Sequence, residues 1–265
     1  MNIIVCVKCV PSSCSGSQQR ENGLEREKTT QILNPYDLYA LEAALEIRDR
    51  LKENVHITVL SMGPASVKEV LKQIFYLGVE RMILLSDKAF AGSDTLATAY
   101  ALQKAVEKSG AFDLIICGQQ SADGDTGQVG PMLAGNLNIP FLTQVMKITD
   151  ITPVSLTSTR NTDYETQVIK IPMPALLCIR NLANHPRSGN LKDYYRNKNR
   201  EVELWDRESI GADGKKCGQI GSATKVIEII RPPVNQNCEF IEGNTDAAAD
   251  KLVDIFSQKG FVRNL

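Results

Sequence analysis

The feature that most constrains the fold is a regular alternation of apolar, strand-like runs with helical patterns along the first half of the chain. The strand-like runs lie at residues 2–10, 56–62, 81–87 and 112–117, and they are rich in β-branched residues. Between them, apolar residues recur at helical spacing on one face. Strands that alternate with helices pair in parallel through right-handed crossovers, with helices on both faces. The sequence therefore predicts a doubly wound α/β fold with a mainly parallel sheet.

Beyond the fourth strand the pattern changes. Short runs predict hairpin-type strands that extend the sheet, at residues 145–148, 154–159, 166–171 and 175–179. Residues 187–201 are basic and polar, residues 206–224 are rich in Gly and Lys, and residues 246–258 form an amphipathic helical pattern. We therefore expect a domain at 1–183, followed at 184–265 by an extended arm that lies across a partner or the main domain.

The composition limits the classes of protein to which the chain can belong. The chain has 265 residues, of which 43% are hydrophobic, so it can bury a substantial core. Its formal net charge is -1, which implies no general attraction to nucleic acid or anionic lipid. No apolar run is long enough to span a bilayer, and residues 1–10 lack the pattern of a signal peptide. We expect a cytoplasmic protein that neither binds nucleic acid nor inserts into a membrane.

The cysteines are scattered along the chain, at positions 6, 9, 14, 117, 178, 217 and 238. The spacing Cys6-x-x-Cys9, with Cys14 beyond it, invites a redox or cluster interpretation. Residues three apart on a strand point to opposite faces, however, and no second pair completes a four-thiolate site. We expect reduced thiols that pack in the core, and no metal.

A glycine-rich segment at residues 118–130 follows the fourth strand and precedes a short helical pattern. Small residues let the backbone approach a ligand closely, and a helix start favours an anion. Asp125 with Gln128 fits an N-cap and its N3 partner. The segment is either a phosphate cradle or a capped helix after a surface loop. The spacing of its glycines is neither Gly-x-Gly-x-x-Gly nor the Walker pattern, so these motifs do not identify the ligand.

Further candidate residues lie where the predicted parallel strands end, because ligands of such sheets bind at the carboxyl edge. A second helix start at Ser93–Thr95 could offer N–H groups to a pyrophosphate. Lys8 is either a ligand contact or a solvated lysine, and Asn34 is either an N-cap or a ligand contact. Asp123 and Asp125 fit caps or acceptors for ribose hydroxyls.

Catalytic constellations are missing from the sequence. His56 and His185 have no nucleophile signature near them. A bound redox cofactor would explain an active site without acid–base residues, because the cofactor carries the chemistry.

Five segments together resemble one family, the beta subunits of electron transfer flavoproteins. They lie at residues 4–11, 33–42, 60–64, 118–130 and 160–178, and the resemblance covers nearly the whole chain. Ser158 and Tyr164 depart from the family pattern, which usually has a small aliphatic residue and a Gly or acid there. The resemblance implies a Rossmann-like domain paired with an alpha subunit that holds its own FAD.

The resemblance also bears on the cofactor. Housekeeping members bind AMP in the beta subunit, whereas electron-bifurcating members hold the ADP part of a second FAD there, which exchanges hydride with NAD(H) and feeds ferredoxin. Residues 85–98 look like the bifurcating type. The family pattern implies ligand contacts at Cys6, Lys8, Asn34, Ser61, Met62, Asp94, Thr95, Thr98, Gln119, Gln120, Ser121, Asp123, Asp125, Thr126, Gly127, Gln128, Val129 and Gly130.

Residues 184–191 are similar to the family's recognition arm, in which one leucine, here Leu191, anchors a partner dehydrogenase. The lysine-rich run that usually follows is diluted at residues 192–198. The partner is therefore an acyl-CoA dehydrogenase or a flavin-linked lactate dehydrogenase, and a solvated basic loop is the plain alternative. An alternative from another class is an ATP-binding stress-type regulator or an adenylating enzyme on a similar fold. The phosphate-binding motifs of those proteins are not found in this sequence.

Overall fold

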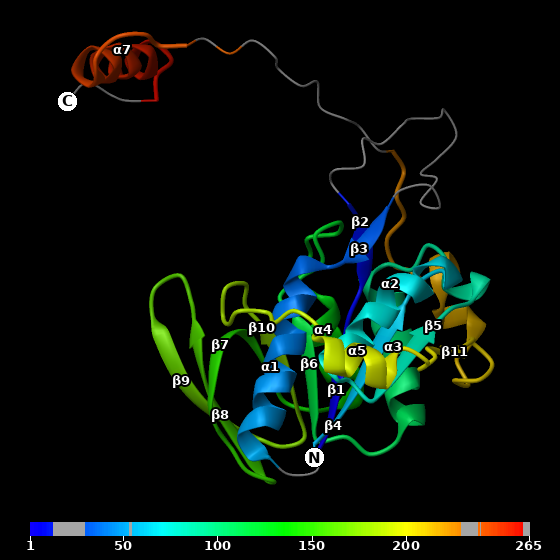
Figure 1. The fold of residues 1–265 in the computed structure, drawn as a ribbon. Helices are drawn as coiled ribbons and strands as arrows, with labels where there is room; N and C mark the ends of the chain where they lie inside the picture. Colours follow the sequence, from blue (N-terminus) through cyan, green and yellow to red (C-terminus); the bar gives the residue numbers. More distant parts are fainter. Residues whose placement is uncertain (13–29, 53–54, 229–237, 239, 262–265) are drawn as a thin grey trace. The chain divides into compact units, whose positions relative to one another are not determined.

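The computed structural model describes residues 1–12, 30–52, 55–228, 238 and 240–261 (Figure 1). Within this part of the chain, nine strands form one sheet in the order β11-β5-β4-β1-β6-β10-β7-β8-β9. The strands are β1 (Asn2–Cys6), β4 (His56–Met62), β5 (Arg81–Leu85), β6 (Leu114–Gly118), β7 (Phe141–Ile151), β8 (Ser155–Asn161), β9 (Thr166–Pro172), β10 (Ala175–Ile179) and β11 (Glu203–Trp205).

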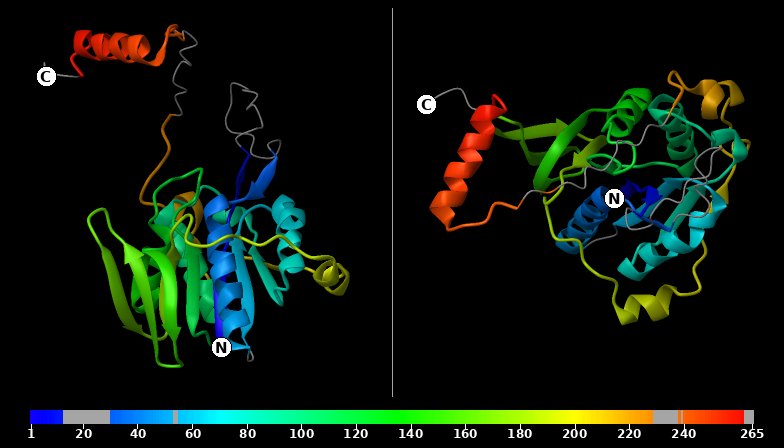
Figure 2. Two further views of the ribbon diagram at one scale, coloured as in Figure 1. Left: turned by 60° about the vertical axis from the view of Figure 1, so that its left-hand side comes forward. Right: turned by 90° about the horizontal axis from the view of Figure 1, so that it is seen from above.

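The sheet is parallel from β11 to β7 and antiparallel from β7 to β9. Helices cover both faces of the parallel part (Figure 2). On one face α1 (Pro35–Leu51) and α2 (Lys68–Lys72) build one core cluster with the sheet. On the other face α3 (Thr95–Ser109) and α4 (Val129–Leu137) build the second. The predicted doubly wound α/β fold with an antiparallel extension is confirmed.

The first strand is shorter than the sequence predicts. The apolar run at 2–10 divides into β1 and β2 (Cys9–Pro11), and β2 leaves the main sheet to pair antiparallel with β3 (Gln31–Leu33). The cause is a change of partner at the strand end, because the backbone N–H of Lys8 donates to the Asp37 carboxylate at 2.7 Å instead of continuing the ladder. Of the loop or loose hairpin predicted at 12–31, residues 13–29 lie outside the described residues.

The prediction for the last short run, β10, is wrong in its topology. β10 is not a hairpin strand but lies between β6 and β7 and runs parallel to both. All five of its residues are buried, which is typical of a central parallel strand covered on both faces.

The chain divides into two compact units, Met1–Lys225 and Val226–Leu265. The first unit includes α5 (Leu191–Asn197), which forms where a basic loop was expected, then β11 and α6 (Gly218–Gly221). The second unit contains α7 (Thr245–Gln258), which confirms the predicted amphipathic helix. The expected functional division after residue 183 stays a prediction. No helix in the described ranges has the length and apolar character needed to cross a membrane.

Candidate functional site

The order of the strands places a topological switch point between β1 and β6, where a doubly wound sheet is expected to have its ligand crevice. From β1 the chain first builds β4 and β5 to one side and then returns to add β6 on the other side. Such a reversal separates the loops that follow the two strands, and ligands of doubly wound sheets bind there, outside the carboxyl ends. The loops in question follow Cys6 and Gly118, so two of the segments predicted to bind ligand lie at this point.

A buried carboxylate, Asp37, joins the two loops, and the sequence analysis missed it. Asp37 lies in the first turn of α1, and besides the backbone of Lys8 it contacts Gly118 so closely that a Cβ there would collide with it. Burial raises the pKa of Asp37 to about 7, although hydrogen bonds from Lys8, Asn34 and Gly118 lower it. The signal in the sequence was an acid at the N3 position of a helix that opens Asn-Pro.

Asn34 holds the glycine-rich loop. Its Nδ2 donates to the carbonyl oxygen of Gln120 at 2.8 Å, and its Oδ1 accepts from the backbone N–H of Ala122 at 3.1 Å. Asn34 occupies the N-cap position of α1, but its side chain makes no cap hydrogen bond. The N-cap alternative for this side chain is therefore wrong, because the loop backbone takes both of its polar atoms.

Lys8 reaches across the crevice to the same loop. Its Nζ lies 2.6 Å from the Asp123 carboxylate and 3.4 Å from Ser121 Oγ. The Lys8 side chain is 43% exposed, so it is both paired with Asp123 and solvated, and its contact with a ligand stays a prediction. The pair offsets the negative charge of Asp123, which reduces the repulsion that an anionic ligand would meet here.

The start of α4 differs from the predicted capping pair. The helix begins at Val129 with Gln128 as its N-cap and without a side-chain cap, while Asp125 has φ +54° and accepts from Gln120 Nε2. The prediction of Asp125 as N-cap is wrong, because the loop turns at Asp125 before the helix begins. The third helical residue is Pro131, which has no N–H, so the backbone donors of this first turn are those of Val129 and Gly130.

The start of α3 is capped as predicted. Asp94 is the N-cap, and its carboxylate accepts from the backbone N–H of Ala97 at 3.0 Å. Thr95 Oγ1 donates to Gln128 Oε1 at 3.1 Å. The starts of α3 and α4 therefore touch, and two sets of helix N–H groups come together at one edge of the sheet.

Ser61 adds an unusual polar group near the end of β4. Its residue is fully buried, and its hydroxyl has no hydrogen-bond partner. A buried hydroxyl without a partner is costly in a native structure. The side chain is fully covered by the protein, so contact of this hydroxyl with a ligand stays a prediction.

Three thiols lie beneath this edge in one row. Cys6, Cys117 and Cys178 are register partners across β1, β6 and β10. A Cβ on Gly130 would lie 2.5 Å from Cys178 Sγ, so glycine lets α4 start directly above the row. A hydrogen bond with Cys6 and burial raise the pKa of the Cys117 thiol, and burial raises that of Cys178 to about 12. Both stay protonated at neutral pH.

The strand ends between the two thiols of Cys6-x-x-Cys9, and both are partly buried, with Cys6 packed against the second core cluster and Cys9 against the first. Across the described ranges, no group of three or more His, Cys, Asp or Glu side chains is arranged to hold a metal ion. Cys14 lies outside those ranges.

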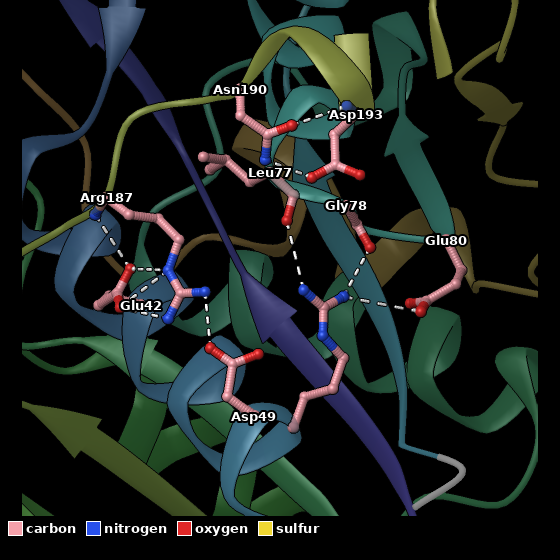
Figure 3. A network of polar contacts seen from close by, with 9 residues as sticks. Glu42, Asp49, Leu77, Gly78, Glu80, Arg187, Asn190 and Asp193 are labelled. Atoms are coloured by element: carbon pink, nitrogen blue, oxygen red, sulfur yellow. Dashed lines mark hydrogen bonds and ion pairs between the residues drawn. The ribbon is translucent and has the colours of Figure 1, made fainter. Parts of the chain in front are cut away.

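Leu191 lies at the first position of α5, and 75% of it is exposed. The segment before it is fixed to α1, because Arg187 donates to the buried carboxylate of Glu42 at 2.8–3.0 Å and to Asp49 at 2.7 Å (Figure 3). Asn190 caps α5 by accepting from the N–H of Asp193 at 2.9 Å. The leucine is thus presented to solvent from an ordered base.

The structure therefore gathers most of the predicted site residues and leaves one apart. Lys8 and Asn34 contact the 119–128 loop, and Thr95 contacts its end. Leu191 belongs to a separate surface on α5.

These features define a doubly wound α/β protein with interlocked polar loops at its switch point, and comparison with known proteins gives its family. The electron transfer flavoprotein domain family matches residues 22–209. Protein FixA of Azorhizobium caulinodans is 38% identical, covering 98% of this chain and 95% of its own. Electron transfer flavoprotein subunit beta of Megasphaera elsdenii is 38% identical, covering 96% and 97%. The caffeyl-CoA reductase-Etf complex subunit CarD of Acetobacterium woodii is 35% identical, covering 99% and 100%. The chain belongs to the electron transfer flavoprotein family.

Proposed function

We propose that this chain is the beta subunit of an electron-bifurcating electron transfer flavoprotein and that it binds FAD in the crevice between β1 and β6. The observation that carries the proposal is the contact between the starts of α3 and α4, made by Thr95 and Gln128. Two adjoining helix starts give more backbone donors than one phosphate needs, which suits the diphosphate of FAD. The similarity to CarD, a subunit of a reductase–Etf complex by name, supports the same type.

The chain's own groups would bind and orient the cofactor. The backbone N–H groups of Thr95, Val129 and Gly130 would donate to the diphosphate. Lys8 would neutralise the Asp123 carboxylate beside it. Bound FAD supplies the redox chemistry, since acid–base side chains are not needed for hydride exchange with NAD(H).

The proposed function implies a definite path for the two electrons of NADH. NADH delivers two electrons to this site. One leaves for a low-potential acceptor such as ferredoxin, and the other passes to the FAD of the alpha subunit and on to a dehydrogenase of the lactate or acyl-CoA type. In the opposite direction NAD is the final acceptor. Leu191, exposed on its ordered base, is the proposed anchor for that dehydrogenase.

The test is to purify the chain with its co-expressed alpha subunit, denature the complex, and identify the released nucleotides by mass spectrometry. Two FAD molecules for each heterodimer are expected. One FAD with one AMP would instead mark a housekeeping electron carrier, and ATP hydrolysis by the isolated chain would point to the regulator class. The variant Asn34→Ala, which frees the loop backbone, should lower the nucleotide content of this subunit, whereas Asn161→Ala on the exposed hairpin should not.

A further inference from the structure

A segment far along the chain packs onto the connection between β5 and α3. Residues 206–224, which we name the strap, follow β11 and return across residues 86–94. The backbone N–H of Arg207 donates to the Asp87 carboxylate at 3.0 Å. The backbone N–H of Gln219 donates to the Ala91 carbonyl at 3.0 Å. The strap is thus bound at both ends of the connection.

The strap is also seated by packing. Cys217 and Ile210 are buried members of the second core cluster. Gly218 has φ +58°, and a Cβ on it would collide with the carbonyl oxygens of Ala89 and Ala91. Only glycine combines this backbone conformation with so close an approach. The strap is therefore part of the first unit's structure and not a loose Gly- and Lys-rich loop.

The end of the strap holds the residue that caps α3. Thr224 donates to Asp94 Oδ2 through its backbone N–H at 2.9 Å and its hydroxyl at 3.1 Å. The N–H of Asp94 donates to Ser222 Oγ at 2.8 Å, and Asp94 Oδ1 caps Ala97. Although partial burial raises it, hydrogen bonds from Ala97 and Thr224 hold the pKa of Asp94 below its ordinary value. The carboxylate is ionised and bound on both oxygens.

We propose that Ser222 and Thr224 are positioning residues for the nucleotide crevice: by holding Asp94 they fix the first turn of α3, which presents Thr95 to the ligand and to Gln128. This inference rests on the proposed function. Without the strap contacts Asp94 would still cap Ala97 by itself, but its carboxylate would be free to rotate. The first turn would then fray, and an ordering cost would be added to binding.

The test compares Thr224→Val, which removes the hydroxyl donor, with Thr224→Ser, which keeps it. The matched control is Thr166→Val, which removes a hydroxyl bond of 3.0 Å to Asn161 on the exposed hairpin. Each variant is made in the full chain with its alpha subunit. Hydrogen exchange of the amides at 95–98 is measured without nucleotide, and the affinity of stripped protein for ADP and for FAD is measured by calorimetry.

Thr224→Val should speed exchange at 95–98 and weaken ADP and FAD binding, each by about fivefold, which is the scale of one ordinary hydrogen bond in water. Thr224→Ser should restore both, and the hairpin control should change neither. Unchanged exchange and affinity in Thr224→Val would overturn the positioning role while the nucleotide site stands. If wild-type protein binds neither ADP nor FAD, the proposed function fails, and the exchange data alone decide whether the strap orders α3.

Discussion

At the scale of single residues, Asp37 is the group whose charge and position matter most. It is buried, it joins the loop after β1 to the loop after β6, and its pKa is raised to about 7. The Asp37 carboxylate accepts from the backbone N–H of Lys8, which is partly buried and would otherwise have no partner. The backbone conformation at this point therefore depends on that carboxylate. One carboxylate thus shapes a crevice formed by two distant segments.

The raised pKa predicts a specific dependence of stability on pH. In the unfolded chain Asp37 ionises near its ordinary value of 3.8, and in the folded chain near 7. Between these values the folded state binds more protons, so the contribution of Asp37 to stability falls as pH rises from about 4 to about 7 and is constant above. The slope is at most about 1.4 kcal/mol per pH unit for one proton.

The variant Asp37→Asn should remove this contribution. Urea unfolding measured at several pH values should show a flatter profile between about pH 4 and pH 7 than the wild type shows. Asp150→Asn, an exposed change of the same chemistry on β7, should leave the profile as it is. A profile of Asp37→Asn that parallels the wild type would show that Asp37 titrates normally.

Ser158 gives a second prediction at this scale. It is fully buried in β8 and its hydroxyl has no partner. Ser158→Ala should therefore stabilise the protein by about 1 kcal/mol, because it removes an unsatisfied group at little change in volume. Ser155→Ala loses a contact of 3.1 Å to Thr152 and should do the opposite. Denaturant midpoints of the two variants decide the matter.

At the scale of elements, the sequence predicted those helices and strands that are determined by a local residue pattern. Strands β4 and β5 and helices α3 and α7 lie where apolar periodicity and caps placed them, because burial and capping act over a few residues. The position of β10 was not predictable from its pattern, since five buried apolar residues suit either a hairpin or a central strand. β11 escaped prediction because three residues carry too little periodicity.

In the candidate site, too, only the local contacts were predictable from the sequence. The helix start at Ser93–Thr95 is local and was predicted, and Asp94 caps it. The use of Asn34 by the loop at Gln120 spans 86 residues, and no local pattern encodes such a pairing. The missed role of Asp37 has the same origin, because its partners Lys8 and Gly118 become neighbours only when the sheet forms.

The ion pair that joins the segment at residues 184–191 to α1 leads to a prediction about stability. Glu42 is buried on α1, and the partly exposed Arg187 satisfies both of its oxygens. Arg187→Met should destabilise the fold by about 2 kcal/mol, since it leaves the carboxylate unpaired at a site that water partly reaches. The double variant Glu42→Met with Arg187→Met should recover most of this loss. Thermal unfolding tests both, and equal losses in the single and double variants would show that the arm needs the ion pair itself.

At the scale of the whole molecule, the two units differ in how they hide apolar surface. Both core clusters of the first unit end by residue 217. In the second unit, taken by itself, α7 has no buried residue, and Leu252, Val253 and Phe256 are exposed to 40% or more. A helix with a bare apolar face of this kind needs a covering partner, and the family pairs its beta subunits with alpha subunits.

A chain that ends at Lys225 should therefore keep its fold and lose its partner. Its melting temperature should differ from that of the full chain by less than about 3 °C, which corresponds to less than about 1 kcal/mol at this size. Co-purification with the alpha subunit should fall sharply, and the full-length variant with Leu252→Asp and Phe256→Asp should show the same loss without any truncation. A truncated chain that melts far below the full one would show instead that residues 226–265 support the α/β fold. In that case the apolar face of α7 would belong to the folding of this chain and not to its assembly.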